Sequence, residues 1–184
     1  IVINAAAYTA VDNCETHYND AYAVNALGPK YLAITCKNIN IPLIHISTDY
    51  VFEGSKKSPL VEGDKIGPKT VYGKTKLAGE KFIQENCQKY FIIRTAWLFG
   101  INGKNFVQTM LNLSKNQKEI RVVNDQIGSP TFSYDLAISI KELLNSDKYG
   151  IYHLTNKGEC SWYDFAKKIF ELSKINVKII LVSS

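Results

Sequence analysis

Residues 43–50 read Leu-Ile-His-Ile-Ser-Thr-Asp-Tyr, and residues 71–80 read Val-Tyr-Gly-Lys-Thr-Lys-Leu-Ala-Gly-Glu. The first stretch predicts a short apolar strand that ends in hydroxyl and carboxylate side chains. The second opens an amphipathic stretch that runs to about residue 86 and predicts a helix. A buried strand followed by a helix is the repeating unit of parallel α/β folds, so these two segments decide the fold class.

The same alternation continues along the chain and predicts an α/β fold with a doubly wound, Rossmann-like parallel sheet and part of a smaller lobe. Gly28-Pro29 interrupts the first helical stretch and predicts a kink there. Ser133 and Ser161 are candidate N-caps, and Asp164 completes a capping-box pattern with Ser161. The expected strands are residues 1–4, 43–47, 91–95, 120–123, 151–154 and 177–182, and the expected helices are roughly residues 21–37, 71–86, 105–115, 134–144 and 162–173.

Composition excludes several classes of protein. Of the 184 residues, 46% are hydrophobic and 21% are charged, which is typical of a globular protein. The net charge of +5 is spread along the chain, so we expect no nucleic-acid partner, and no apolar run is long enough to predict a membrane span. Four cysteines without metal-like spacing indicate free thiols and a cytoplasmic location. Both ends lie within apolar runs, so we expect a fragment.

Tyr72 and Lys76 carry the candidate chemistry. Residues four apart share a helix face, and a nearby ammonium lowers the pKa of a phenol. Thr48 ends the preceding strand, where its hydroxyl can donate to a carbonyl oxygen, so the three residues suit carbonyl reduction by a bound hydride donor. The alternative is a packed ring beside a solvated amine, which is common for this spacing. The hydroxyl at the strand end favours the functional interpretation.

For several other segments, the sequence is compatible with both a functional and a structural role. Ala5-Ala6-Ala7 leaves room for a flat or phosphorylated ligand, but equally suits a tight turn. Trp97 offers a face to a sugar or base, or packs in a core. The sequence from Gly128 to Thr131 predicts a rigid turn. The three histidines are far apart in sequence and are interpreted as structural or surface residues rather than metal ligands.

Six collinear segments resemble the extended short-chain dehydrogenase/reductase family, and most closely its dTDP-4-dehydrorhamnose reductases. The resemblance implies reduction of dTDP-4-dehydro-L-rhamnose to dTDP-L-rhamnose with NADPH or NADH, in the biosynthesis of surface polysaccharide. The segments are NAAAYTAVD (residues 4–12), STDYVF (47–52), VYGKTKLAGE (71–80), RTAWLFG (94–100), NDQIGSPT (124–131) and Tyr152–Leu154 with Trp162.

The resemblance also implies roles for individual residues. Tyr72 is the catalytic acid, Lys76 is its partner and a ligand of the nicotinamide ribose, and Thr48 assists at the carbonyl. The residues implied to line the cofactor are Ala7, Tyr8, Thr9, Tyr72 and Lys76, and those implied near the sugar nucleotide are Val11, Thr48, Asp49 and Trp97. A dTDP-sugar is the implied partner, without nucleic acid, membrane or metal, and the resemblance leaves room for a homodimer.

One departure from the family pattern limits what the sequence predicts. None of the eleven glycines forms the G-x-x-G-x-x-G loop that binds the dinucleotide, so the choice between NADH and NADPH stays open. We expect residues 1–123 to form a partial dinucleotide-binding domain and residues 124–184 to contribute to the substrate lobe and the sheet edge. Two alternatives remain: a related reductase for another nucleotide-activated keto sugar, and a non-catalytic subunit resembling the regulatory subunit of methionine adenosyltransferase.

Overall fold

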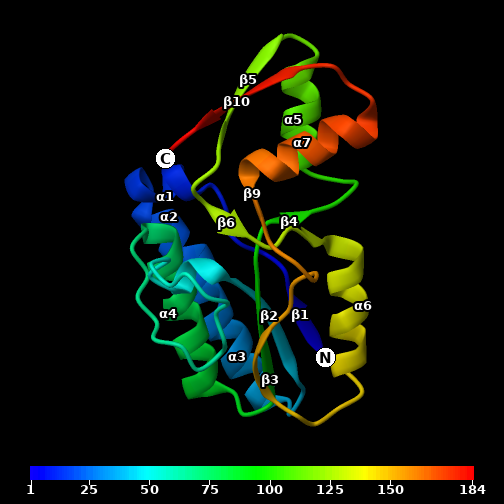
Figure 1. The fold of residues 1–184 in the computed structure, drawn as a ribbon. Coiled ribbons are helices and arrows are strands. Elements are labelled where there is room, and N and C mark those ends of the chain that lie inside the picture. Colours follow the sequence, from blue (N-terminus) through cyan, green and yellow to red (C-terminus); the bar gives the residue numbers. More distant parts are fainter. The chain divides into compact units, whose positions relative to one another are not determined.

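The computed structural model describes all 184 residues, Ile1–Ser184, and its contacts divide the chain into two units. The first unit comprises Ile1–Thr95 and Leu143–Leu154, and the second comprises Ala96–Glu142 and Thr155–Ser184. The chain therefore leaves the first unit at the end of one strand and returns to it before another (Figure 1).

A four-stranded parallel sheet forms the centre of the first unit. Neighbouring strands align with Val2 beside Leu43, Leu43 beside Tyr90 and Phe91 beside Gly150. All four strands point the same way, so their carboxyl ends lie at one edge, as the sequence predicted. In spatial order the strands are β1 (Val2–Asn4), β2 (Leu43–Thr48), β3 (Tyr90–Thr95) and β8 (Gly150–His153).

Helices connect these strands and cover the sheet of the first unit. Two of them, α3 (Gly28–Asn38) and α4 (Val71–Asn86), lie against each other and against the strands (Figure 1). Between them and the sheet lies a core of fully buried apolar side chains, so the helical positions of the sequence pattern bury the expected face. This core contains Ala33, Cys36, Leu43, Ile83, Cys87 and Ile92. The shorter helices are α1 (Val11–Thr16), α2 (Tyr18–Tyr22) and the 3₁₀ turn η2 (Asp49–Val51).

The predicted interruption at Gly28-Pro29 is a change of helix type. The chain continues from α2 into a π-helical turn, η1 (Ala23–Leu27), and then into α3. Pro29 lies in the first turn of α3, and because it has no N–H it cannot donate to a carbonyl of the preceding π turn. The π turn carries Asn25, whose side chain is fully buried.

Two glycines allow α4 to lie directly on neighbouring backbone. A Cβ at Gly73 would lie 2.2 Å from the carbonyl oxygen of Tyr50, and a Cβ at Gly79 would lie 2.2 Å from that of Asn25. No side chain fits at either distance. Glycine has a low helix propensity, so these two residues lower the intrinsic stability of α4 but allow the helix to approach its neighbours closely.

Gly79→Ala should therefore destabilise the protein by about 1–3 kcal/mol, although alanine is the better helix former. The new methyl group must push α4 away from Asn25. Urea unfolding measures the change, and Lys81→Ala on the exposed side of the same helix is the control, with an expected effect within about 0.5 kcal/mol. Equal or greater stability of Gly79→Ala would contradict the close packing.

The second unit is built from three pairs of strands and three helices. Its core lies between the parallel pair β5 (Glu119–Val123) and β10 (Lys178–Val182) and the helices α5 (Phe106–Ser114) and α7 (Trp162–Ser173). The buried members of this core are Met110, Ile120, Val122, Ala166, Ile169 and Phe170. The remaining elements are β4 (Leu98–Phe99) with β7 (Thr131–Phe132), β6 (Ile127–Gly128) with β9 (Cys160–Ser161), and α6 (Ser133–Leu143), nearly all of which lies in this unit.

The α/β class, the parallel sheet and each of the expected strands and long helices are confirmed, apart from shifts of a few residues at their ends. Ser161 is an N-cap, and its capping box with Asp164 is formed. The strands expected at 120–123 and 177–182 pair with each other instead of joining the main sheet. Four short strands and α1 were not expected, because segments of two to six residues carry little periodicity.

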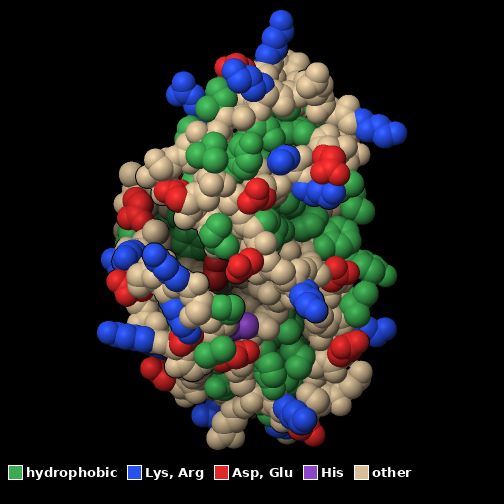
Figure 2. All heavy atoms as spheres, viewed as in Figure 1, with side chains coloured by type: hydrophobic (Ala, Val, Ile, Leu, Met, Phe, Trp, Pro, Cys, Tyr) green, Lys and Arg blue, Asp and Glu red, His purple; other side chains and the backbone are tan.

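The two units divide at Thr95, earlier than the expected boundary after residue 123. The reason is strand pairing, because β8 lies beside β3 and draws residues 143–154 into the first unit. Positive and negative side chains are interspersed on the face shown in Figure 2. No helix is both long and apolar enough to cross a membrane.

Candidate functional site

The carboxyl edge of the parallel sheet brings three predicted segments together in the first unit. Asn4 pairs with His45, and Thr48 pairs with Thr95, so the chain continues from β1, β2 and β3 at the same edge. Ala5 and Ala6 follow β1 and are exposed. The hydroxyl oxygen of Thr95 is buried there without a hydrogen-bond partner. Ligands of parallel α/β sheets bind at this edge.

Thr48 and Tyr72 lie side by side, as the sequence predicted. Tyr72 is in the first turn of α4, which Thr70 caps by accepting a 3.1 Å hydrogen bond from the Gly73 amide. The Thr48 hydroxyl accepts a 3.2 Å hydrogen bond from the Tyr50 amide and donates a 3.0 Å bond to Asp49. The Tyr50 ring meets the Tyr72 ring edge to face at 5.3 Å. Strand end, helix cap and aromatic contact together hold the phenol in place.

The Tyr72 phenol is protonated at neutral pH. Burial raises its pKa to about 12, while hydrogen bonding with Thr48 opposes the rise and the nearby Asp49 carboxylate adds to it. Burial also raises the pKa of Asp49. The sequence predicted that Lys76 would lower the pKa of Tyr72, and that prediction is wrong for this structure, where burial dominates. A protonated phenol can still donate to a developing alkoxide.

Lys76 is directed into the sheet, and its side chain is almost fully buried. Its Nζ donates a 2.7 Å hydrogen bond to the carbonyl oxygen of Ile46 and lies 3.2 Å from Nε2 of His45. Burial lowers the pKa of Lys76 to about 8, and the Glu80 carboxylate partly opposes this. The helix spacing was predicted correctly, but the lysine contacts strand β2.

Lys76→Met should remove a pH dependence of stability. The ordinary lysine pKa is 10.5 and the folded value is about 8, so between these values the unfolded state binds more protons and stability rises with pH. The rise attributable to Lys76 is at most about 3 kcal/mol. Urea unfolding of both proteins from pH 7 to 10 gives the difference curve. If the difference in unfolding free energy between the two proteins did not change with pH, the burial of the amine would be contradicted.

A buried ion pair joins α4 to the sheet one turn beyond Lys76. Arg94 donates from Nε to Glu80 at 3.0 Å and from Nη2 at 2.7 Å, and both side chains are only 2% exposed. Ser47 also donates to the Glu80 carboxylate. Arg94 reaches the Glu62 carbonyl oxygen at 3.4 Å, which links the loop after β2 to the same cluster. Both charges are paired and hydrogen-bonded. These short contacts require α4 and the strands to stay at a fixed distance from each other.

Arg94→Met should destabilise the protein by about 3–5 kcal/mol, because it leaves the Glu80 carboxylate buried and uncompensated. The double variant Glu80→Gln/Arg94→Met should recover much of that loss, since no unpaired charge remains. Unfolding free energies complete the double-mutant cycle. The exposed pair Lys168–Glu171 is the control, and Lys168→Met should change stability by less than about 1 kcal/mol. Equal losses in the single and double variants would contradict the interpretation.

Asn25 holds the segment that contains Ala7, Tyr8 and Thr9. Its side chain accepts a 2.8 Å hydrogen bond from the Tyr8 amide and donates a 3.1 Å bond to the Tyr8 carbonyl oxygen. It also donates to Thr75 at 3.2 Å, and Thr75 donates to the Tyr72 carbonyl oxygen at 2.9 Å. Asn25 was not among the predicted site residues, because a single asparagine within a helical stretch carries no signal of this contact.

Val11 and Trp97, both expected near a sugar nucleotide, lie in different units. Val11 begins α1 in the first unit, next to the Tyr8 segment in sequence. Trp97 lies in the second unit and has a left-handed φ of 47°. Its ring stacks on Trp162 with centroids 3.4 Å apart, and a Cβ at Gly128 would lie 2.3 Å from it. Gly128 thus leaves room for the Trp97 indole, in addition to forming part of the predicted turn.

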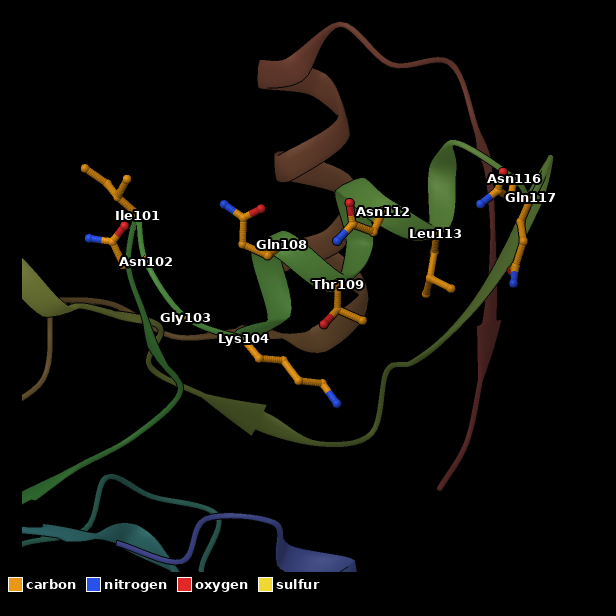
Figure 3. A pocket seen from close by; sticks show the side chains of 10 residues that line it. All are labelled: Ile101, Asn102, Gly103, Lys104, Gln108, Thr109, Asn112, Leu113, Asn116 and Gln117. Carbon is orange, nitrogen blue, oxygen red and sulfur yellow. The ribbon is translucent and has the colours of Figure 1, made fainter. Parts of the chain in front are cut away.

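A groove of about 670 Å³ lies in the second unit beside α5 and contains none of the predicted site residues (Figure 3). The loop before α5 forms one wall, and amide side chains on the helix form the other. No acidic or metal-binding cluster lies in it, and no group of three or more His, Cys, Asp or Glu side chains elsewhere is arranged to hold a metal ion. The chemistry is therefore assigned to the sheet edge, where the buried ionisable groups gather.

Residues 1–182 match the protein family described as "RmlD substrate binding domain". The chain belongs to this family. The Bacillus subtilis protein named "Spore coat polysaccharide biosynthesis protein SpsK" is 47% identical over the whole chain, which covers 65% of that protein. The dTDP-4-dehydrorhamnose reductase of Escherichia coli is 44% identical over 93% of the chain and 59% of its own length.

Solved structures of dTDP-4-dehydrorhamnose reductases have the same fold as this chain. A dTDP-4-dehydrorhamnose reductase from Clostridium acetobutylicum is 49% identical, with a TM-score of 0.97 over the whole chain and 65% of its own. The Bacillus anthracis reductase, solved in complex with NADP, is 45% identical, with a TM-score of 0.97 over the whole chain and 66% of its own. The chain thus spans less than two thirds of the length of these relatives.

Proposed function

We propose that the full-length protein reduces the 4-keto group of dTDP-4-dehydro-L-rhamnose and forms dTDP-L-rhamnose. The observation that carries the proposal is the pairing of buried Thr48 with half-buried Tyr72 at the carboxyl edge of the sheet, with the buried Lys76 one helical turn further along α4. Relatives at 44% and 48% identity are named dTDP-4-dehydrorhamnose reductases, which supports this substrate. The proposed setting is the cytoplasm, in keeping with four free cysteines.

The residues at the edge fit a reduced nicotinamide cofactor. Ala5 and Ala6 are exposed and small, so a flat ring can approach the backbone there. Lys76 donates one N–H to Ile46 and, whether its amine is charged or neutral, retains at least one more for a ribose hydroxyl. The Thr95 hydroxyl also lacks a partner. The residues proposed to hold the cofactor are Ala7, Tyr8, Thr9, Tyr72 and Lys76.

The cofactor, NADPH or NADH, supplies a hydride to the carbonyl carbon when it is bound. Tyr72 donates its proton to the carbonyl oxygen, which becomes the hydroxyl of the product, and the phenolate recovers a proton from solvent. The single hydroxyl proton of Thr48, which the structure shows donated to Asp49, turns to the same oxygen and stabilises its developing charge. Val11, Asp49 and Trp97 are the residues proposed to lie near the sugar nucleotide. The NADP complex of the Bacillus anthracis relative supports NADPH as the first choice for assay.

Tyr72→Phe in the full-length protein should lower kcat by about 10²–10⁴-fold, because the ring stays and only the proton donor is lost. NADPH oxidation with dTDP-4-dehydro-L-rhamnose measures the rate. Tyr31→Phe, on the exposed side of α3, is the matched control and should keep the wild-type rate. Near-normal turnover by Tyr72→Phe would remove this residue from its proposed role.

The same assay separates the alternatives. A preference for another nucleotide-activated keto sugar would keep the Thr48–Tyr72–Lys76 chemistry and change only the substrate. Failure to oxidise NADPH with any such sugar, together with tight binding to a partner enzyme, would favour a regulatory subunit instead. The buried lysine argues for the reductase, since burying an amine destabilises a fold that has no use for it.

A further inference from the structure

His45 is a buried ionisable residue that the proposed chemistry does not use. It lies in the middle of β2 with no exposed surface. Its Nδ1 is 3.0 Å from Nδ2 of Asn4 on β1, and its Nε2 is 3.2 Å from Nζ of Lys76 on α4. Three polar side chains from three elements thus form one hydrogen-bonded chain that ends at the proposed cofactor ligand.

The partners of Asn4 assign the tautomer of His45. The Asn4 side-chain oxygen accepts a 3.2 Å hydrogen bond from the Ala6 amide, so the Asn4 NH₂ group faces the imidazole. Nδ1 of His45 is therefore the acceptor, and the single proton of a neutral ring sits on Nε2. An Nε2–H cannot accept a hydrogen bond from an ammonium. It matches Lys76 in the amine form, which accepts from Nε2 and donates to Ile46.

Resting on the proposed reductase function, we propose that His45 is the positioning residue for Lys76, and that the Asn4–His45 pair favours the neutral amine. A proton added to Lys76 then requires His45 to move its own proton from Nε2 to Nδ1. The new Nδ1–H faces the Asn4 NH₂, so the Asn4 amide must turn over and release the Ala6 amide. The charge of Lys76 is in this way linked to the backbone that follows β1, where the cofactor is proposed to lie.

The surrounding charges are compatible with this coupling. On α4, Glu80 raises the pKa of Lys76, but its carboxylate is paired with Arg94 of β3. From β1, the neutral Asn4 is the residue that faces the ring. Burial, and then the charge of Lys76, lower the pKa of His45 well below its usual range, so the ring stays neutral while Lys76 titrates. On α3, Lys30 lies over the Phe82 ring and Lys37 acts on Cys87.

The wild-type protein offers the first test, which does not depend on activity. Long-range ¹H–¹⁵N spectra of the full-length protein should show His45 protonated on Nε2 above about pH 8, and a change of tautomer, with a shift of the Ala6 amide, below it. Titration of the Lys76 side chain by ¹³C NMR should follow the same midpoint. A ring protonated on Nδ1 throughout, or a Lys76 midpoint at 10.5, would overturn the inference.

Two substitutions of His45 distinguish a role in positioning Lys76 from a role in core packing alone. His45→Gln presents an amide oxygen that can accept from an ammonium, so the Lys76 midpoint should rise by about one pH unit or more, and the pH profile of the cofactor KM should move with it. His45→Asn is too short to reach Lys76, so the cofactor KM should rise about tenfold while kcat falls less. Exposed His17→Gln is the control. An unchanged Lys76 midpoint in His45→Gln would overturn the proposal.

Asn4→Leu provides a variant that keeps His45, in case the His45 variants do not fold. It removes the group that selects the tautomer, so the Lys76 midpoint should again rise, and an unchanged midpoint would count against the proposal. The experiments distinguish a failure of the proposed reductase function from a failure of the proposed His45–Lys76 coupling. If the wild-type protein reduces no nucleotide keto sugar, the NMR titrations still decide the role of His45. If it is active and the titrations show no coupling, the reductase function stands and the coupling is wrong.

Discussion

The close contact of helix α4 with the parallel sheet is the constraint on which the site depends. Gly73 and Gly79 let the helix approach neighbouring backbone, and the buried Glu80–Arg94 pair holds it at that distance. A buried ion pair adds little net stability over apolar packing, but it tolerates little displacement because a lost partner leaves a charge in the protein interior. The pair therefore serves geometry more than stability.

That geometry determines the ionisation of the two central side chains. The first turn of α4 places Tyr72 against Thr48, and the next turn directs Lys76 between β2 and the helix. Both groups lose solvent, so the phenol keeps its proton and the amine gives its proton up more easily. The apolar core of α3, α4 and the strands offsets the cost of burying them. An acid that stays protonated is suited to donation at neutral pH.

Local sequence pattern was enough to identify some of the functional residues but not others. Thr48 and Tyr72 were identifiable because one ends an apolar strand and the other begins an amphipathic helix, and parallel strands bring such points together. Asn25 and His45 were not, because each acts through a partner 17 to 50 residues away in sequence. Trp97 was recognised as a candidate surface, but its stacking on Trp162 depends on folding of the second unit.

The sequence alone determined the elements of this protein: its alternating strands and helices, the capped start of α7, and the hydroxyl and phenol that the proposed chemistry needs. Hydrophobic periodicity and capping are local, so they can be read without a structure. The tertiary structure decided where the units divide, which way Lys76 points and how far each pKa moves. Those properties come from burial and from contacts between distant segments, and no local pattern encodes them.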